Sequence, residues 1–233
     1  MLRLTLAAAP VDAASFRRPL ARCELAHCRG TCCAEGVWLN PEVASVVEKL
    51  ARRYPVELAA LGLDLDQPLV EIDETPGETP AARTRRRPHP FHALVADYPF
   101  HFPDTRCALL TDDARCALQV VAELEGRHPW HYKPPACWLH PISAARDAIR
   151  LHDALGDPYP GGFTSATHCG RTAACGRPAA EVLAPELAFL GELLERDLLA
   201  ELEPSPRSGQ ARGAGDAGRP DAAAPSHARP DPP

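Results

Sequence analysis

Apolar side chains recur at helical spacing in the first third of the chain. Segment 41–53 places them at the i, i+3, i+4 and i+7 positions of an amphipathic helix: Val43, Val46, Val47 and Leu50. Asn40 stands before this segment as an N-cap, and Pro41 occupies its first position. The pattern predicts a helix from about Pro41 to Arg53 that lays one apolar stripe on the core.

Three further segments have helical features. Pro55 opens a short helix to Ala60, with Gly62 just beyond its end. Segment 118–125 is periodic and stops at Gly126. Leucines between 183 and 202 predict a long helix that Pro185 divides into a short lead and a main body.

Short alternating or apolar runs predict strands at 3–6, 36–39, 68–72 and 148–152. Two runs on either side of segment 111–114 predict a hairpin with Cys107 and Cys116 at its base. The proline-rich segment 126–142 predicts irregular structure, with Pro134-Pro135 stiffening the approach to Cys137. Segment 73–90 predicts a polar surface loop, and its arginines at 83 and 85–87 are expected to be solvated, with the binding of an anion as the alternative.

These elements predict an α+β fold, because short strands and helices do not alternate in the order of a parallel sheet. We expect one small irregular cysteine-rich, metal-centred domain over residues 1–203, with short strands and peripheral amphipathic helices. Residues 204–233 contain proline, glycine, alanine and scattered charges without an apolar face. This composition predicts a disordered low-complexity tail.

Charge and hydropathy limit the partners. The formal net charge is -6 over 233 residues and the arginines are dispersed, which argues against a nucleic-acid partner. No segment reaches the roughly 20 apolar residues that span a bilayer, so we expect no membrane partner. The opening MLRLTLAAAP is interrupted by Pro10 and Asp12, too early for a signal peptide. These features predict a cytoplasmic protein.

Nine cysteines carry the candidate chemistry, and four of them fall in the stretch CELAHCRGTCC: Cys23, Cys28, Cys32, Cys33, Cys107, Cys116, Cys137, Cys169 and Cys175. In a reducing compartment clustered cysteines indicate metal binding, whereas a secreted chain would use them as a disulfide framework. The adjacent pair Cys32 and Cys33 argues against simple disulfides, because neighbouring cysteines bridge each other only with strain.

Thiolates are ligands of soft and borderline metals, so the cysteines predict an iron–sulfur cluster or zinc. The spacing C-x4-C-x3-C-C is neither a zinc ribbon nor a bacterial ferredoxin run, and it does not select the metal. His27, His140 and His168 stand near cysteines as ligands or as hydrogen-bonding neighbours of the sulfurs. Trp38, Trp130 and Trp138 are expected to form an apolar shell around the site.

The order of these elements resembles a bacterial cysteine-cluster family (CxxxCxxCC-type) described as zinc- or iron-chelating. The resemblance rests on the opening cysteines, on Cys107 and Cys116 with their apolar neighbours, and on the segment KPPACWLHP at 133–141. It covers about Cys23 to Cys175. Lys133 and Trp138 stand where that family usually has arginine, and His140 where it has an aromatic residue. The branch with Gly126, Trp130, Lys133 and Pro134 is the most similar.

The resemblance implies an eight-cysteine metal site, which makes one of the nine surplus; Cys169 or Cys175 is the candidate. Eight thiolates exceed what one zinc needs, which favours a cluster, possibly 4Fe-4S, or two sites, with zinc as the alternative. The expected function is metal binding with a structural or redox role. One alternative is a protein-modifying enzyme resembling flagellin lysine N-methylases, which carry a similar cluster, although no glycine-rich nucleotide loop follows a strand. Another is a zinc-stabilised interaction module. No isolated cysteine marks a catalytic nucleophile.

Overall fold

The computed structural model describes residues 6–73, 81–152 and 162–203. Met1–Glu203 form one compact unit. The predicted disordered tail at 204–233 lies outside the described residues, as does the predicted strand at 3–6 apart from Leu6.

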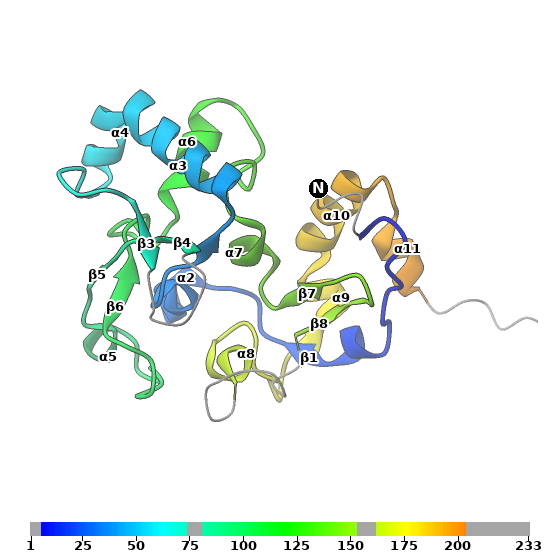
Figure 1. The fold of residues 1–233 in the computed structure, drawn as a ribbon. Helices are drawn as coiled ribbons and strands as arrows, with labels where there is room; N and C mark the ends of the chain where they lie inside the picture. The colour runs from blue at the N-terminus through cyan, green and yellow to red at the C-terminus, as the bar shows by residue number, and fades with distance from the viewer. Residues whose placement is uncertain (1–5, 74–80, 153–161, 204–233) are drawn as a thin grey trace, which may run out of the picture. The chain divides into compact units, whose positions relative to one another are not determined.

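The predicted α+β class is confirmed, because helices combine with short antiparallel strands in small sheets (Figure 1). The strands are β1 Pro19–Leu20, β2 Trp38–Leu39, β3 Val70–Asp73, β4 Ala81–Thr84, β5 Arg86–Pro88, β6 Thr105–Cys107, β7 Ile142–Ala144, β8 Ile149–Leu151 and β9 Arg177–Pro178. They pair as β1-β9, β2-β4-β3, β5-β6 and β7-β8. The strands are too short and the sheets too small to form a continuous layer.

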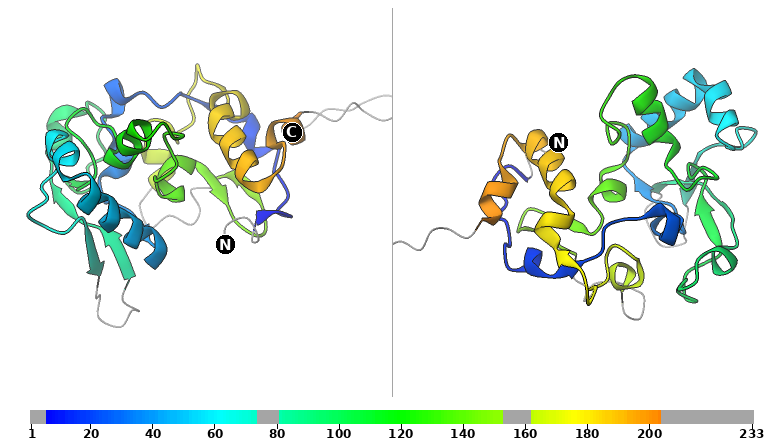
Figure 2. Two further views of the ribbon diagram at one scale, coloured as in Figure 1. Left: turned by 90° about the horizontal axis from the view of Figure 1, so that it is seen from above. Right: turned by 180° about the vertical axis from the view of Figure 1, so that it is seen from behind.

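Short helices connect these sheets. Those of 3-10 type are η1 Ser15–Arg17 and η2 Thr31–Cys33. The α-helices are α2 Leu25–Cys28, α3 Pro41–Arg53, α4 Pro55–Ala60, α5 Phe91–Leu94, α6 Ala117–Leu124, α7 Pro135–Leu139, α8 Phe163–Ala166, α9 Ala179–Val182, α10 Ala184–Leu194 and α11 Leu198–Leu202. In Figure 2, as in Figure 1, α3 lies beside α6, and α10 lies beside α11. No helix in the described ranges is long and apolar enough to cross a bilayer.

Helix α3 forms as the sequence predicts. The Asn40 side chain accepts a hydrogen bond from the backbone N–H of Val43 at 2.8 Å and caps the helix, while Pro41 occupies its first turn. Val47 and Leu50 are buried against α4 and α6. The predictions of α4 and of α6 are confirmed within one residue.

The predicted surface loop at 73–90 is wrong, because this segment contributes strands β4 and β5. Arg83 is 8% exposed and forms ion pairs with Glu71 at 2.9 Å and Asp73 at 3.0 Å, across the β3-β4 register. Arginines are compatible with strands in this segment because their guanidinium groups pair with carboxylates or donate to backbone carbonyls. Arg85, for example, donates to the carbonyl of Pro68.

Two predictions around the later cysteines need correction. Cys107 ends β6, which pairs with β5, and only an isolated bridge joins Leu110 to Cys116 in place of the predicted hairpin. Segment 126–142 is not wholly irregular, since α7 spans Pro135–Leu139 and contains Cys137. Prolines are compatible with this helix because they occupy its cap and first position, where no backbone N–H is needed.

The predicted division of the C-terminal helix at Pro185 is wrong, because Pro185 lies in the first turn of α10. Glu195 adopts a left-handed conformation and separates α10 from α11. Arg196 in this break donates to the carbonyl of Ala9 at 2.8 Å and so joins the two ends of the compact unit.

Three apolar clusters form the core. The first joins the N-terminal segment, α7, the β7-β8 hairpin and α9 to α11. The second contains α3, α4, α6 and the strand end at Cys107. The third surrounds Phe91, and Cys33 contacts both the second and the third. Cys33 therefore lies where the second and third clusters meet.

Candidate metal centre

The N-terminal cysteine stretch folds back on itself. Arg29 and Gly30 both adopt left-handed conformations after α2, which reverses the chain before η2. The Thr31 hydroxyl donates to the carbonyl of Cys28 and fixes this turn. The reversal brings Cys32 back toward Cys28 at the end of the preceding helix.

A first group of thiols consists of Cys23, Cys28, Cys32 and Cys169. Contact with the Cys169 thiol is the main cause that raises the pKa of Cys23 to about 12, and the Cys28 thiol is also in contact with Cys23. The pKa of Cys28 is raised, first by that contact and then by burial. Cys32 has an electrostatic interaction with both Cys23 and Cys28. The group thus combines the opening stretch with a cysteine more than 130 residues later.

A second group consists of Cys33, Cys107, Cys116 and Cys137, which line a small cavity of about 20 Å3. Burial raises the pKa of Cys107 to about 11 and is the main cause that raises the pKa of Cys137. Neighbouring thiols raise both further. Burial and the repulsion between thiolates favour the protonated forms of Cys107 and Cys137 until a cation neutralises the charge.

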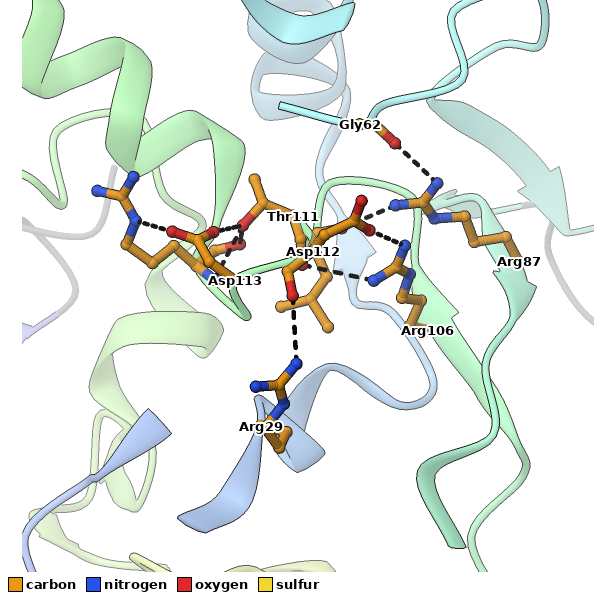
Figure 3. A network of polar contacts seen from close by, with 9 residues as sticks. Arg29, Gly62, Arg87, Arg106, Thr111, Asp112 and Asp113 are labelled. Carbon is orange, nitrogen blue, oxygen red and sulfur yellow. Dashed lines mark hydrogen bonds and ion pairs between the residues drawn. The ribbon is translucent and has the colours of Figure 1, made fainter. Parts of the chain in front are cut away.

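Arginines hold the turn between Cys107 and Cys116 (Figure 3). Arg106 donates to the Asp112 carboxylate at 2.7 Å, and Arg29 donates to the Asp112 backbone carbonyl at 3.3 Å. Arg87 donates to the carbonyl of Leu110 at 3.0 Å. The Arg106 guanidinium lowers the pKa of Asp112. Since Arg29 follows Cys28 directly, this network ties the opening stretch to the turn that positions Cys107 and Cys116.

A larger cavity of about 260 Å3 is shared by both groups. It is lined by six of the cysteines: Cys23, Cys32, Cys33, Cys116, Cys137 and Cys169. The basic side chains of Arg22, Arg115 and Lys133 also line it. Arg22 is held by the carboxylate of Glu186 at 2.9 Å and by the carbonyl of Val182 at 2.6 Å. The site therefore gathers cations around thiols.

Lys133 lies among the thiols of both groups. Burial lowers its pKa, the thiols of Cys116 and Cys33 raise it, and the net shift is upward. No ion pair joins Lys133 to a carboxylate in the part of the chain that the structure describes. Contact with Cys33 is the main cause that lowers the pKa of Cys32, and the pKa of Cys33 is raised correspondingly. The Lys133 ammonium also lowers the pKa of Cys32 and is therefore placed to stabilise thiolate charge.

The predicted neighbours of the sulfurs divide into two sets. Trp130 and Trp138 stack at 5.5 Å and line the shared cavity, as predicted for an apolar shell. Trp38 does not, because it is 57% exposed and lies against Arg83. His140 also lines the shared cavity and hydrogen-bonds to Thr167 at 2.8 Å.

The remaining histidines flank the first group on another side. His27 stacks on His168 with ring centroids 5.6 Å apart, and the Glu24 carboxylate contacts Nδ1 of His27 at 2.6 Å. Cys175, by contrast, is exposed and lines neither cysteine cavity. Of the two candidates for the surplus cysteine, Cys169 contacts Cys23 and Cys175 stands apart.

The donor set fits a soft metal, because thiols converge in partly dry cavities beside basic groups. As they stand, no three or more Cys, His, Asp or Glu side chains in the described ranges form a group that could hold a metal ion. All nine cysteines are free thiols. Metal binding consequently requires the sulfurs of each group to draw closer together, and the ligand set stays a prediction.

No family model, curated protein or solved structure matches the chain. The resemblance to the cysteine-cluster family therefore stays a prediction that rests on the residues quoted for it. The sequence interpretation missed the pairing of Cys169 with Cys23 and the position of Lys133. A signal for the latter is that Lys133 and Lys49 are the chain's two lysines, while its other basic side chains are arginines and histidines.

Proposed function

We propose that the protein binds metal through two groups of four cysteines and holds an iron–sulfur cluster in a structural or redox role, with zinc as the alternative. The observation that carries this proposal is the convergence of seven thiols from separate chain segments on two adjoining cavities, with the eighth, Cys28, in contact with Cys23. Groups of four thiolates suit both a cluster and tetrahedral zinc.

The charges around the thiols support the same function. Binding a metal releases protons from the thiols and leaves negative charge on the sulfurs. Lys133 lines the shared cavity and can balance that charge. Arg22 and Arg115 also line it but are paired with Glu186 and Asp113.

Three apolar clusters distinguish this proposal from a purely zinc-stabilised interaction module. Classical zinc modules depend on their metal for folding, at about 10–16 kcal/mol per site. Here residues such as Phe16, Leu118 and Leu187 are buried in clusters made mainly of aliphatic and aromatic side chains. Much of the secondary structure is expected to survive metal removal, which leaves the metal available for a redox role.

Anaerobic purification with metal analysis, acid-labile sulfide analysis and a visible spectrum tests the proposal. We expect iron and sulfide in equal amounts, roughly four of each per occupied group. Stoichiometric zinc in a colourless protein would refute the iron–sulfur cluster and support metal binding with zinc as the metal. A folded, fully reduced protein that takes up neither iron nor zinc under reconstitution would refute the function.

A further inference from the structure

A second cavity of about 260 Å3 opens beside the first cysteine group, away from the cavity that both groups share. It is formed by the end of α2, the loop that follows α5 and the segment 166–171. Cys28 is the one cysteine among its lining residues. The volume is slightly below the roughly 300–1,000 Å3 of sites for drug-sized ligands, which suits a small molecule.

The walls of this cavity favour a flat apolar body. Val95, Pro99 and Ala166 supply aliphatic surface. The imidazoles of His27 and His168 lie nearly parallel, at an interplanar angle of 15°. Glu24, which does not line the cavity, holds the His27 ring through Nδ1. The ring orientation is therefore fixed from outside the cavity, as in preformed binding sites.

The charged side chains of the cavity favour an anionic group on the ligand. Arg171 lines it and faces Asp97 across 3.6 Å, a distance longer than a hydrogen bond. The two side chains are 44% and 77% exposed, so the pair contributes little and gives way readily. The planar guanidinium of arginine binds a carboxylate through two parallel hydrogen bonds.

We propose that this cavity binds a small organic carboxylate with a planar apolar body. The carboxylate pairs with Arg171 in place of Asp97, and the body lies against the imidazoles and aliphatic wall. A cationic ligand fits less well, because Asp97, the single carboxylate lining the cavity, is 77% exposed and stays solvated, whereas Arg171 is 44% exposed. Recognition of the carboxylate by Arg171 does not use the proposed metal ligands, although one of them, Cys28, lines the cavity.

Benzoate is the probe, and benzamide is its neutral counterpart of nearly the same shape. Titration of the full-length protein is followed by NMR of the histidine rings, with His27→Gln and His168→Gln identifying the two resonances. We expect saturable shifts of both with benzoate and at least about tenfold weaker binding of benzamide. Equal binding of both probes, or no shift with benzoate, would overturn the proposal.

Two variants give opposite expectations. Arg171→Gln should weaken benzoate binding about tenfold or more. Asp97→Asn should strengthen it about two- to fivefold, because a competing carboxylate is removed. Arg150→Gln and Asp147→Asn are matched controls, since this exposed pair on the β7-β8 hairpin has similar exposure. Weaker binding by Asp97→Asn, or unchanged binding by Arg171→Gln, would show that the cavity does not recognise a carboxylate in this way.

Discussion

Cys32 and Cys33 are neighbours in the chain, yet they belong to different groups of thiols. Cys32 interacts with Cys28 of the first group, whereas Cys33 interacts with Cys107 and Cys137 of the second. One peptide unit therefore links the two groups, and each thiol affects the other directly. An adjacent pair is therefore compatible with the proposed binding of metal at two sites, whereas a disulfide between neighbouring cysteines would be strained.

The two groups predict that cysteine variants separate by group. Cys28→Ser should remove the metal of the first group, and Cys137→Ser should remove that of the second, because each takes away one of four thiolates. Each variant should therefore keep about half of the wild-type metal. Metal per protein is measured by mass spectrometry after anaerobic reconstitution.

Cys175→Ser is the matched control for these variants, because Cys175 is exposed and lines neither cysteine cavity. It should retain the full metal content. If Cys28→Ser and Cys137→Ser each abolish all metal binding while staying folded, a single shared centre would replace the two groups.

Lys133 should strengthen metal binding. Protonated thiols are neutral, whereas a four-thiolate metal site is negatively charged, so the ammonium stabilises the bound state more than the free state. Lys133→Met is expected to lower zinc affinity about tenfold, equivalent to about 1.4 kcal/mol, and Lys133→Arg should retain most of it. Competition with a chromophoric chelator at neutral pH measures the affinity.

Lys49→Met, on an exposed position of α3, is the control and should bind zinc as the wild type does. Affinity that is equal in Lys133→Met and Lys49→Met would mean that the Lys133 ammonium does not balance the thiolates.

Local signals in the sequence predicted the parts of the fold that depend on them. Helix α3 needs only Asn40, Pro41 and its apolar stripe, and all three are visible in the sequence. Strand β4 could not be recognised in the same way, because Arg83 is buried only by virtue of ion pairs with the neighbouring strand. The sequence does not reveal the start of α7, because two consecutive prolines are typical of rigid irregular segments. Proline is nevertheless compatible with the first helical position that Pro135 occupies.

For the candidate site too, the sequence predicts local features but not long-range contacts. Cysteine spacing indicated metal chemistry, but grouping depends on tertiary contacts such as that of Cys169 with Cys23. The turn at Arg29 and Gly30, and the arginine network around Asp112, decide which sulfurs face one another. Such long-range contacts leave no periodic pattern in one sequence.

Gly36, between Cys33 and β2, should not tolerate alanine. Its φ is +74°, and an added Cβ would lie 2.6 Å from Oγ1 and 2.9 Å from the backbone oxygen of Thr84. That hydroxyl also accepts the Val37 N–H at 2.9 Å. Left-handed strain costs about 1–2 kcal/mol and overpacking adds about 1–3 kcal/mol. Urea unfolding of Gly36→Ala measures the loss of stability.

Gly126→Ala separates the two contributions, because Gly126 has φ +66° and nothing within 4 Å of its added Cβ. Gly126→Ala should therefore be destabilised by the left-handed backbone strain alone, without overpacking. If both variants lose the same free energy of unfolding, the close approach of Gly36 to Thr84 has no energetic consequence.

Glu125 should stabilise the protein at neutral pH, and this contribution should be lost in acid when its carboxylate is protonated. Its carboxylate accepts hydrogen bonds from the hydroxyls of Tyr132 and Tyr54, each at 2.5 Å, and from Arg127 at 2.9 Å. These bonds, with Tyr132 first, lower its pKa to about 2 from a usual value of 4.5. Because the folded-state pKa is the lower one, the contribution is complete above about pH 4.5 and is lost as the pH falls toward 2.

Comparison of the wild type with Glu125→Gln isolates this effect. The variant should be less stable at pH 7, and the difference should shrink as the pH falls from 4.5 toward 2, because only the wild type loses an ionised acceptor there. Urea unfolding at pH 7, 4.5 and 3 gives the two curves. Acid also releases metal from thiolates, but it does so in both proteins and cancels in the difference. Glu192→Gln, exposed on α10, should parallel the wild type. A constant gap between wild type and Glu125→Gln across this range would show that the tyrosine hydroxyls do not stabilise the ionised carboxylate.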